Sequence, residues 1–312
     1  MKLVALAGGT GAAKFLRGLA RASDDPGDSR AMTIVGNTGD DLEVWGLSIS
    51  PDLDTLTYTL AGLVDDSKGW GVAGDTFLCR ATMAALGQPT FFALGDKDLA
   101  IHIHRTERLG AGVPLSQVTD LLRTRLGVAS RLLPMSDDRV RTRVRTPSGW
   151  LAFQEFFVRD RCEPDVVDVI YEGASEALPA PGVIEALHEA DAVLICPSNP
   201  VSSIGPILAV PGIREALLET RARVAAISPI VRDAAVTGPA GKMMRAKGLA
   251  VSALGVAHAY DGLLDMLVID RGDAAIAAPL RALGIDAVVA DIVMTGRETE
   301  VELASVVLKA LA

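Results

Sequence analysis

The sequence has few aromatic residues, few cysteines and no long hydrophobic run. Phe, Trp and Tyr make up 4% of its 312 residues, so a core must be built from Ala, Val, Leu and Ile. The cysteines Cys79, Cys162 and Cys196 form no CxxC pair, which argues against a disulfide framework or a zinc ribbon and indicates a reducing compartment. No run approaches the roughly 18–20 apolar residues that cross a bilayer, and the apolar stretch at the N-terminus is too short for a signal peptide. We therefore expect a cytoplasmic protein that does not enter a membrane.

Positive charge is also in short supply. The formal net charge is −9 at pH 7. General nucleic-acid binding requires a basic surface, so we expect no nucleic-acid partner. The acidic balance still permits a small anionic ligand that is held by backbone amides and a metal ion. The length and the 49% hydrophobic content predict one or two domains with a sizeable core.

Apolar strands alternate with helices along most of the chain. The runs 2–7, 31–35, 90–94, 192–196, 223–227, 266–269 and 287–290 are continuous and apolar, as in a parallel sheet that helices cover on both faces. Residues 128–180 instead alternate or carry β-branched residues, which predicts antiparallel hairpins. We expect an α/β fold with a Rossmann-like, mostly parallel sheet. Its core comprises residues 1–127 and 181–312, and residues 128–180 form a smaller, inserted, antiparallel β-rich subdomain.

The N-terminal stretch MKLVALAGGTGAAK predicts a buried strand, a glycine-rich turn and a helix. Glycine amides at the positive end of a helix make a natural phosphate cradle, so Gly9, Thr10 and Gly11 are candidate phosphate ligands. Lys14, one turn into the helix, can add a positive charge. The stretch matches neither GxGxxG nor the P-loop pattern, so an ordinary strand–helix connection is the alternative.

Polar, glycine-bearing segments follow six of the predicted strands. In an open parallel sheet these segments lie at the carboxyl edge, where ligands bind. The segment PSNPVSSIGP (197–206) offers Ser198, Asn199, Ser202 and Ser203, whose neutral donors and acceptors suit a nucleotide phosphate or base edge. Lys242 in the turn 238–242 could face a phosphate by the same argument. A proline-stiffened surface loop is the alternative for residues 197–206.

Four aspartates, Asp40, Asp41, Asp52 and Asp54, lie within fifteen residues of each other. Carboxylates beside glycines suit Mg²⁺, which takes one or two of them together with phosphate oxygens and waters. One of the four could instead be a general base for a hydroxyl nucleophile. Helix capping and turn formation are the structural alternatives. Asn37 opens the same turn as Asp40 and is a candidate contact for a nucleotide or phosphate.

Asp96, Lys97 and Asp98 follow the predicted strand 90–94. Lys97 could contact a substrate or a phosphate, or it could pair with a neighbouring aspartate. His102 and His104 are two residues apart and do not share a helical face, so histidine ligation of a metal is not expected. The residues alone support a Mg²⁺-assisted enzyme that acts on a phosphorylated, nucleotide-like ligand.

Nine motifs occur in one order over nearly the whole chain. They are GGTGAAK (8–14), NTGDD (37–41), SPDLDT (50–55), LGDKD (94–98), LPMSDD (133–138), FQEFFV (153–158), PSNPVSSIGP (197–206), SPI (228–230) and GPAGK (238–242). Together they resemble the 2-phospho-L-lactate transferase family of coenzyme F-420 biosynthesis. The resemblance implies a Rossmann-like core with a smaller insertion, in a homodimer. It also implies a Mg²⁺-dependent transfer of a three-carbon phospho group from a guanosine diphosphate conjugate to Fo (7,8-didemethyl-8-hydroxy-5-deazariboflavin), with GMP as the leaving group.

The resemblance and the positions of the motifs together suggest roles for individual residues. The diphosphate would lie on Gly9, Thr10 and Gly11, with Lys14 and Asn37 nearby, and the guanosine nucleotide would lie by Ser198, Asn199, Ser202 and Ser203. Asp54 would contact Fo and is a candidate base, Asp40 is a candidate for catalysis and for Mg²⁺, and Asp41 and Asp52 would join it at the metal. Lys97 and Trp45 are further candidates for Fo binding, and Trp70 and Phe77 are also candidates for an aromatic slot around its ring.

The resemblance leaves the transferred group open among phospholactyl, enolpyruvyl phosphate and phosphoglyceryl. GGTGAAK differs from both an archaeal-like GGTGTPK and an actinobacterial-like GGVGGAR, whereas LPMSDD and GPAGK are closer to the archaeal form. A non-catalytic regulator that binds a nucleotide sugar or a dinucleotide would share the GGTG opening. An NAD-dependent oxidoreductase is disfavoured because GxGxxG is missing.

Overall fold

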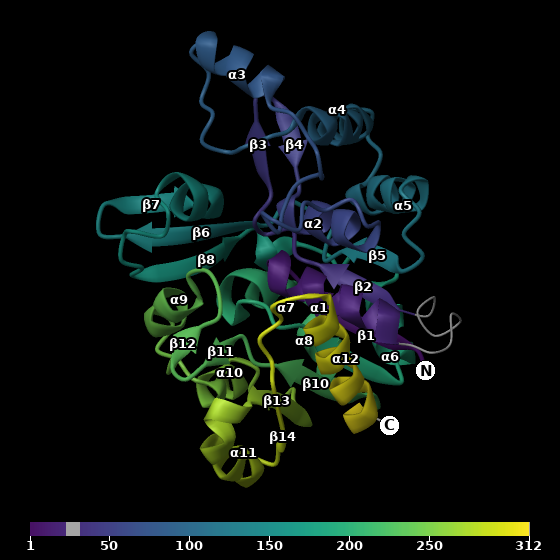
Figure 1. Cartoon of the computed structure of the whole chain (residues 1–312), viewed down its shortest axis with the longest axis vertical. Coiled ribbons are helices and arrows are strands. Elements are labelled where there is room, and N and C mark those ends of the chain that lie inside the picture. The colour runs from purple at the N-terminus through teal and green to yellow at the C-terminus, as the bar shows by residue number, and fades with distance from the viewer. Residues whose placement is uncertain (23–31, 312) are drawn as a thin grey trace.

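The computed structural model describes residues 1–22 and 32–311, and its centre is a seven-stranded parallel sheet (Figure 1). The strands are β1 (Leu3–Ala7), β2 (Thr33–Gly36), β5 (Arg131–Pro134), β9 (Ala192–Ile195), β10 (Arg223–Ile227), β13 (Met266–Asp270) and β14 (Asp286–Ala290). They lie in the order β14-β13-β10-β9-β1-β2-β5, and every neighbouring pair is parallel. The predicted α/β, Rossmann-like fold class is confirmed. Residue 31, the first of the predicted strand 31–35, lies outside the described residues.

Strand β1 shows why helices cover both faces of the sheet. All five of its residues are buried, and alternate side chains enter two different hydrophobic cores. The core that contains Leu3 and Ala5 is covered by α1 (Gly9–Ala22) and α12 (Arg297–Leu311). The core that contains Val4 and Leu6 is covered by α6 (Val183–Glu189), α7 (Gly205–Ala209), α8 (Ile213–Glu219), α9 (Ala240–Ala246), α10 (Ala253–Ala259) and α11 (Ala277–Ala282).

A small lobe stands above the sheet in Figure 1, between β2 and β5 in the chain. It comprises β3 (Leu42–Val44), β4 (Leu47–Ile49), α2 (Pro51–Leu60), α3 (Leu78–Ala85), α4 (Asp96–Gly110) and α5 (Leu115–Arg125). The predicted strand 90–94 is wrong, because these residues are irregular. Their apolar side chains serve the lobe instead, where Leu94 packs beside Val44, Ile49 and Leu99.

The third strand of the sheet is β5, which the sequence placed with the antiparallel insertion. It pairs in parallel with β2, in the register Thr33–Arg131 to Gly36–Pro134. The antiparallel part is β6 (Arg141–Thr146), β7 (Gly149–Ala152) and β8 (Asp168–Glu172). The hairpin predicted within residues 128–180 is therefore present, and a π-helical turn at Glu155–Arg159 follows β7. A two-residue pair, β11 (Ile230–Val231) and β12 (Ala234–Ala235), follows β10.

None of the helices in the described part of the chain has the length and apolar composition to cross a bilayer by itself. Residues 200–209 and 213–219 reach that length and composition only as a pair, and the pair is bent by 86°.

Candidate active site

The strand order changes direction beside β1, and this position creates the site. From β1 the chain adds β2 and β5 on one side, and later adds β9, β10, β13 and β14 on the other. The connections therefore leave β1 and β9 in opposite directions, and a crevice opens at their carboxyl ends. A cavity of about 570 Å³ lies there. Its size is typical of a site that encloses a small-molecule ligand.

The cavity gathers most of the residues that the sequence singled out. Those that line it are Gly9, Thr10, Gly11, Lys14, Asp40, Asp52, Asp54, Ser198, Asn199, Ser202 and Ser203. They come from the first turns of α1, from the turn after β2, from the start of α2, and from the segment after β9, which includes a π-helical turn at Pro200–Ile204. The lining residues Ser228 and Pro229 add the turn after β10. Segments separated by nearly 200 residues thus meet at one edge of the sheet, as the strand-end argument predicts.

Glycine at position 8 allows three of these segments to touch. A Cβ at Gly8 would lie 2.6 Å from Asp52 Oδ2 and 2.8 Å from Ser203 Cβ. Ser198 ties the turn further, because its hydroxyl donates to the Gly8 carbonyl at 2.8 Å and accepts from the Gly8 amide at 3.4 Å. Helix α1 begins at Gly9, so its first amides have no intrahelical partner. These amides sit at the cavity wall and suit an anionic ligand.

The close approach at Gly8 makes a testable prediction. We expect Gly8→Ala to push the turn after β1 away from Asp52 of α2 and from Ser203, and to lower activity at least tenfold, because an extra methyl group has no room beside these two residues. Gly9→Ala is the matched control for space, since nothing lies within 4 Å of the position that its methyl group would take, although its φ of +76° adds backbone strain. Equal kinetic losses in both variants, at equal thermal stability, would contradict the crowding argument.

Asn37 is buried behind the cavity wall and does not line it. Its amide nitrogen donates to Asp52 Oδ2 at 2.9 Å and to the Ser202 carbonyl at 3.3 Å. Its amide oxygen accepts from the Gly39 amide at 2.8 Å. The residue therefore holds an acidic loop against the serine-rich loop, and the structure places it as a brace for the wall.

Asp40 and Asp52 are buried and Asp41 is half-buried, and burial perturbs all three carboxyl groups. Burial and the nearby charge of Asp52 raise the pKa of Asp40 well above its usual range. Burial raises the pKa of Asp52 to about 6, although the hydrogen bond from Asn37 opposes the shift. Burial also raises the pKa of Asp41 to about 7, against the charge of Arg141. One carboxylate oxygen each of Asp40 and Asp41 is buried without a hydrogen-bond partner.

The carboxylates of Asp40 and Asp52 form a pair that fits a divalent cation. Asp40 and Asp52 both face the cavity, whereas Asp41 does not line it and accepts a hydrogen bond from Ser50 at 2.8 Å. Within residues 1–22 and 32–311, no three His, Cys, Asp or Glu side chains enclose a metal site. A cation here would therefore take part of its coordination from a ligand, as Mg²⁺ commonly does from phosphate oxygens.

The raised pKa of Asp52 predicts how stability depends on pH. The folded protein keeps a proton that the unfolded chain releases near pH 4, so this group favours folding at low pH. Its contribution, roughly 2–3 kcal/mol, should be lost as pH rises from about 4 to about 6. In EDTA, urea unfolding at pH 4.5 and pH 7.5 should show a smaller pH effect for Asp52→Asn than for the parent. An equal pH effect in the two proteins would contradict the assignment.

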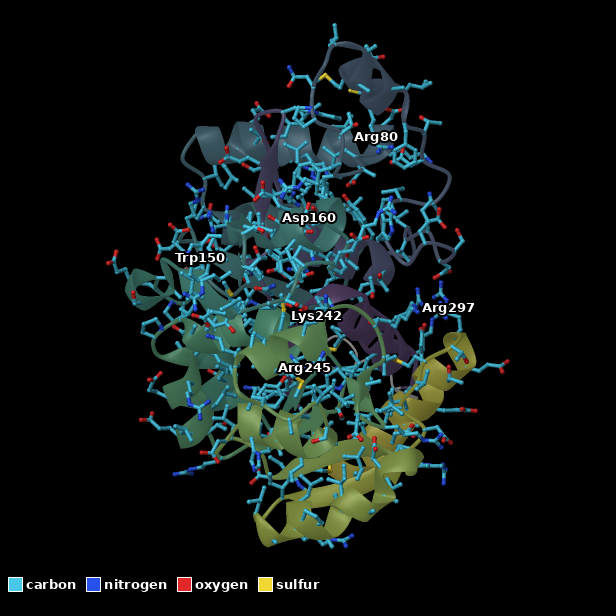
Figure 2. The ribbon with its side chains drawn as sticks, turned by 90° about the vertical axis from the view of Figure 1, so that its left-hand side faces the viewer. Arg80, Trp150, Asp160, Lys242, Arg245 and Arg297 are labelled. Atoms are coloured by element: carbon cyan, nitrogen blue, oxygen red, sulfur yellow. The ribbon has the colours of Figure 1, made fainter. Side chains whose placement is uncertain are left out.

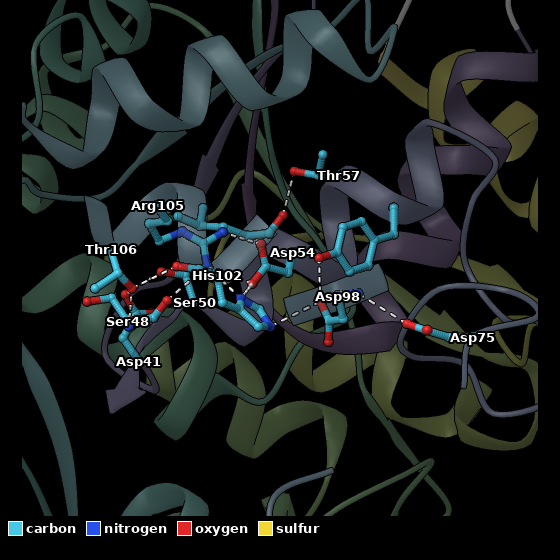
Figure 3. Close-up of polar contacts among 12 residues, drawn as sticks. Asp41, Ser48, Ser50, Asp54, Thr57, Asp75, Asp98, His102, Arg105 and Thr106 are labelled. Carbon is cyan, nitrogen blue, oxygen red and sulfur yellow. Dashed lines mark hydrogen bonds and ion pairs between the residues drawn. The ribbon is translucent and has the colours of Figure 1, made fainter. Parts of the chain in front are cut away.

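Asp54 takes part in a second polar network that the sequence did not reveal (Figure 3). Arg105 on α4 donates to both of its carboxylate oxygens, with Nη1 at 3.0 Å from Oδ2. His102 Nδ1 lies 3.7 Å from the same oxygen, and His102 Nε2 lies 3.1 Å from Asp98 Oδ1. The hydroxyl of Tyr58 donates to Asp98 Oδ1 at 2.5 Å. Asp54, Tyr58, Asp98 and His102 line the cavity.

One signal in the sequence could have revealed the α4 residues of this network. Asp98, His102 and Arg105 are spaced i, i+4 and i+7, so they share one face of a helix. All three are buried in the structure.

Lys97 and Trp45 do not line the cavity. The Lys97 ammonium donates to the Ala73 carbonyl at 3.1 Å, and Trp45 Nε1 donates to the Pro89 carbonyl at 2.9 Å. Trp70, which the sequence also suggested for the aromatic slot, does line the cavity, and so does Phe92, which the sequence did not single out.

Two other lysines differ in their relation to the cavity. Lys68 lines it and also lies 5.7 Å from the Trp70 ring centre and 5.4 Å from that of Phe77, which is not a lining residue. Lys242 points elsewhere: it lies where the insertion meets the C-terminal half (Figure 2), and its ammonium donates to the carbonyls of Cys162 and Glu163, both at 2.8 Å. The expectation that Lys242 faces a phosphate is therefore wrong.

The cavity has two chemically different walls. Between them lie the glycine-rich turn (Gly8–Gly11) and the acidic pair, Asp40 and Asp52. The lobe supplies one wall, with Asp54, His102, Trp70 and Phe92. The C-terminal half and the insertion supply the other wall. It contains residues 197–199, 202–203 and 236–240, and the rings of Phe153 and Phe157, whose centres are 5.5 Å apart. Such an arrangement can hold two ligands whose reacting ends meet at the centre.

Sequence comparisons match this chain over nearly its whole length. A family model described as 2-phospho-L-lactate transferase CofD matches residues 3–307. The chain is 47% identical over 301 residues to a phosphoenolpyruvate transferase of Streptomyces griseus, and the aligned region covers 95% of this chain and 93% of that protein. It is 44% identical over 305 residues to a 2-phospho-L-lactate transferase of Methanosarcina acetivorans, which covers 98% of this chain and 97% of that protein.

Two crystal structures of one Bacillus halodurans protein, a member of the upf0052 family, share the fold. Their TM-scores are 0.67 and 0.63 at 17% sequence identity. The superposed regions comprise 98% of this chain in both cases, and 99% and 98% of the two matched chains.

Proposed function

The chain belongs to the 2-phospho-L-lactate transferase family, a family of coenzyme F-420 biosynthesis, and we propose that it transfers an enolpyruvyl phosphate or phospholactyl group to Fo. The family match confirms the expectation of an enzyme over a non-catalytic regulator. In the proposed reaction the terminal ribityl hydroxyl of Fo attacks the phosphorus distal to guanosine. The products are dehydro-F-420-0 or F-420-0, together with GMP. The observation that carries this proposal is the cavity with two unlike walls around one acidic centre.

The glycine turn and the serine-rich wall suit the guanylated donor. The first amides of α1 can stabilise negative charge on a diphosphate, and Lys14 lies one turn further along the same helix. Ser202 and Ser203 lie on the loop that touches this turn. Asn199 caps that loop, because its side-chain oxygen accepts from the Val201 amide at 2.9 Å. The nucleotide would therefore extend away from the centre along residues 198–203.

Mg²⁺ fits the acidic centre of this site. Asp40 and Asp52 would hold the ion, and Asp41 would support them from behind through Ser50. When bound, the ion would neutralise charge on the donor phosphates. The protein's own part is positioning, because transfers at phosphorus depend chiefly on alignment and electrostatic stabilisation.

The lobe wall suits the acceptor. Trp70 and Phe92 offer apolar rings to the deazaflavin, and Asp54 offers a carboxylate to a ribityl hydroxyl.

We further propose a cytoplasmic homodimer, as the resemblance implies. Identity with the Streptomyces phosphoenolpyruvate transferases, at 46–47%, is somewhat higher than the 42–44% with the Methanosarcina phospholactate enzymes. This difference favours enolpyruvyl phosphate as the transferred group, with phospholactyl and phosphoglyceryl as alternatives.

Binding of Fo alone tests the acceptor wall. We expect Trp70→Ala to weaken Fo binding by about 5- to 150-fold, because a stacking partner of about 1–3 kcal/mol is lost. Trp45→Ala is the matched control, since Trp45 lies in the same lobe outside the cavity. The measurement is a titration of Fo absorbance or fluorescence with each protein, with and without GDP. Absence of binding to the parent at micromolar Fo would contradict the proposed acceptor.

A further inference from the structure

We propose that Arg105 is a positioning residue that fixes the carboxylate of Asp54 toward the acceptor. This inference rests on the proposed function and adds a residue that lies outside the cavity. Its basis is the contact geometry between α2 and α4.

Arg105 is almost completely buried, with 2% of its surface exposed. One guanidinium nitrogen donates to Asp54 Oδ2 at 3.0 Å, and a second donates to Oδ1. Such a two-pronged contact sets the plane of a carboxylate as well as its distance. Figure 3 shows the guanidinium facing the Asp54 carboxylate, with His102 beside them. The orientation of Asp54 is therefore determined by a residue 51 positions away in the chain.

The pairing leaves Asp54 able to accept further hydrogen bonds. A carboxylate has about four acceptor sites, and a two-pronged arginine contact occupies two of them. Asp54 also lines the cavity, whereas Arg105 does not. The remaining acceptor sites are thus those available to a hydroxyl group of a ligand in the cavity. Arg105 acts on that ligand only through Asp54.

Arg105 is itself held on two more sides. Its Nη1 donates to the Ser48 carbonyl on β4 at 3.3 Å and lies 3.2 Å from His102 Nδ1. His102 is in turn next to Asp98, which accepts from Tyr58. The guanidinium therefore links β4, α2 and α4 around one carboxylate. A lysine could not reproduce this planar, multi-donor arrangement.

A second buried arginine provides a matched control. Arg17 is 6% exposed and pairs with Glu300, which is 2% exposed; its Nε lies 2.8 Å from Glu300 Oε2. Neither residue lines the cavity. Loss of either buried ion pair should reduce stability, but only loss of the Arg105 contact should change how the acceptor is held.

The experiment is a double-mutant cycle on the full chain with Fo, a guanylated donor and Mg²⁺. The variants are Arg105→Gln, Arg105→Lys, Asp54→Asn, the double variant Arg105→Gln/Asp54→Asn, and Arg17→Gln. Each is assayed below its melting temperature, with KM measured separately for Fo and for the donor. A melting curve of each unliganded protein accompanies the kinetics.

We expect Arg105→Gln to reduce kcat/KM for Fo by about 100-fold, as small misplacements of a binding group do, and to leave KM for the donor within about twofold. Arg105→Lys should recover only a small part of this loss. In the Asp54→Asn background, Arg105→Gln should cost less than about threefold, because its target is already gone. Arg17→Gln should keep kcat/KM for Fo within about threefold of the parent.

The opposite results would overturn the inference. In the first, the kinetic losses of Arg105→Gln and Asp54→Asn multiply in the double variant. In the second, Arg105→Gln keeps the kcat/KM of the parent for Fo. In the third, Arg105→Gln raises KM for the donor as much as KM for Fo. Failure of the parent to transfer any donor group to Fo would instead overturn the proposed function. In that case the melting curves still test the contact between Arg105 and Asp54. Arg105→Gln leaves the buried Asp54 carboxylate without its partner, so the double variant, which also removes that carboxylate, should be more stable than Arg105→Gln alone. Equal or lower stability of the double variant would contradict it.

Discussion

Replacing Asp54 with Asn should lower the turnover of Fo by about a thousandfold while the protein stays folded. Loss of a group that acts on a reacting hydroxyl typically costs 10²–10⁴-fold. Asn keeps the size of the side chain but removes its charge and replaces one acceptor oxygen with a donor, which faces the buried Arg105 guanidinium. The measurement is product formation followed by mass spectrometry, with circular dichroism as the check on folding.

Two further variants sharpen this result. Asp54→Glu keeps the charge but displaces it, so it should fall between Asn and the parent. Asp120→Asn removes an exposed carboxylate on α5 that pairs with Arg123 and does not line the cavity, so its rate should match the parent. A rate for Asp54→Asn within threefold of the parent would remove Asp54 from catalysis.

Replacing Asp40 with Asn should abolish activation by Mg²⁺ and lower the maximal rate by about a thousandfold. Asp40 is buried at the centre of the site with one carboxylate oxygen unpartnered, and burial raises its pKa well above the usual range. A bound cation would relieve this cost in the parent, and Asn would have no charge for it to neutralise. The same change should raise the stability of the metal-free protein at pH 7.5, because a buried, poorly compensated carboxyl group is removed.

The test of Asp40 combines two measurements on the same preparations. Activity is titrated with Mg²⁺, and melting is followed in EDTA and in excess Mg²⁺. The parent should melt at a higher temperature with Mg²⁺ than with EDTA, and the variant should show little difference. A variant that keeps the parent's Mg²⁺ dependence would move the metal away from Asp40.

The central edge of the sheet could be predicted from the sequence because its signals are local. Strand β1 is a continuous apolar run that ends in glycines, and the runs that form β9 and β10 end in polar turns in the same way. Parallel pairing then forces these ends together, whatever the helices do. The lining of the cavity by Gly9, Asp52 and Ser202 follows from that rule.

The third strand could not be identified by the same rule. Residues 91–94 and 132–135 are both short apolar runs before polar segments. Periodicity does not say which core a run enters, and 90–94 enters the core of the lobe while 131–134 enters the sheet.

The direction of individual side chains also could not be predicted from the sequence. Lys97 and Asp98 are neighbours in LGDKD, but successive helical residues point about 100° apart, so Asp98 lines the cavity and Lys97 does not. Two aspartates of the lobe also serve a structural purpose. The Asp75 carboxylate accepts from the Lys97 amide at 2.8 Å, and Asp96 accepts from the Cys79 amide at 3.0 Å. Each carboxylate thereby accepts a hydrogen bond from a backbone amide in the first turn of a helix that is distant in the sequence. Local capping patterns do not reveal such a contact.

Direct identification of the product tests the central claim, which is that the two walls of the cavity bring Fo and a guanylated donor together. The parent is incubated with Fo, Mg²⁺ and, in parallel, the enolpyruvyl, phospholactyl and phosphoglyceryl conjugates of guanosine diphosphate, and the products are resolved by mass. We expect GMP and an Fo adduct of one three-carbon phospho group, formed fastest from the enolpyruvyl donor and only when Mg²⁺ is present. Absence of an Fo adduct with all three donors, from a protein that is folded, would contradict the account.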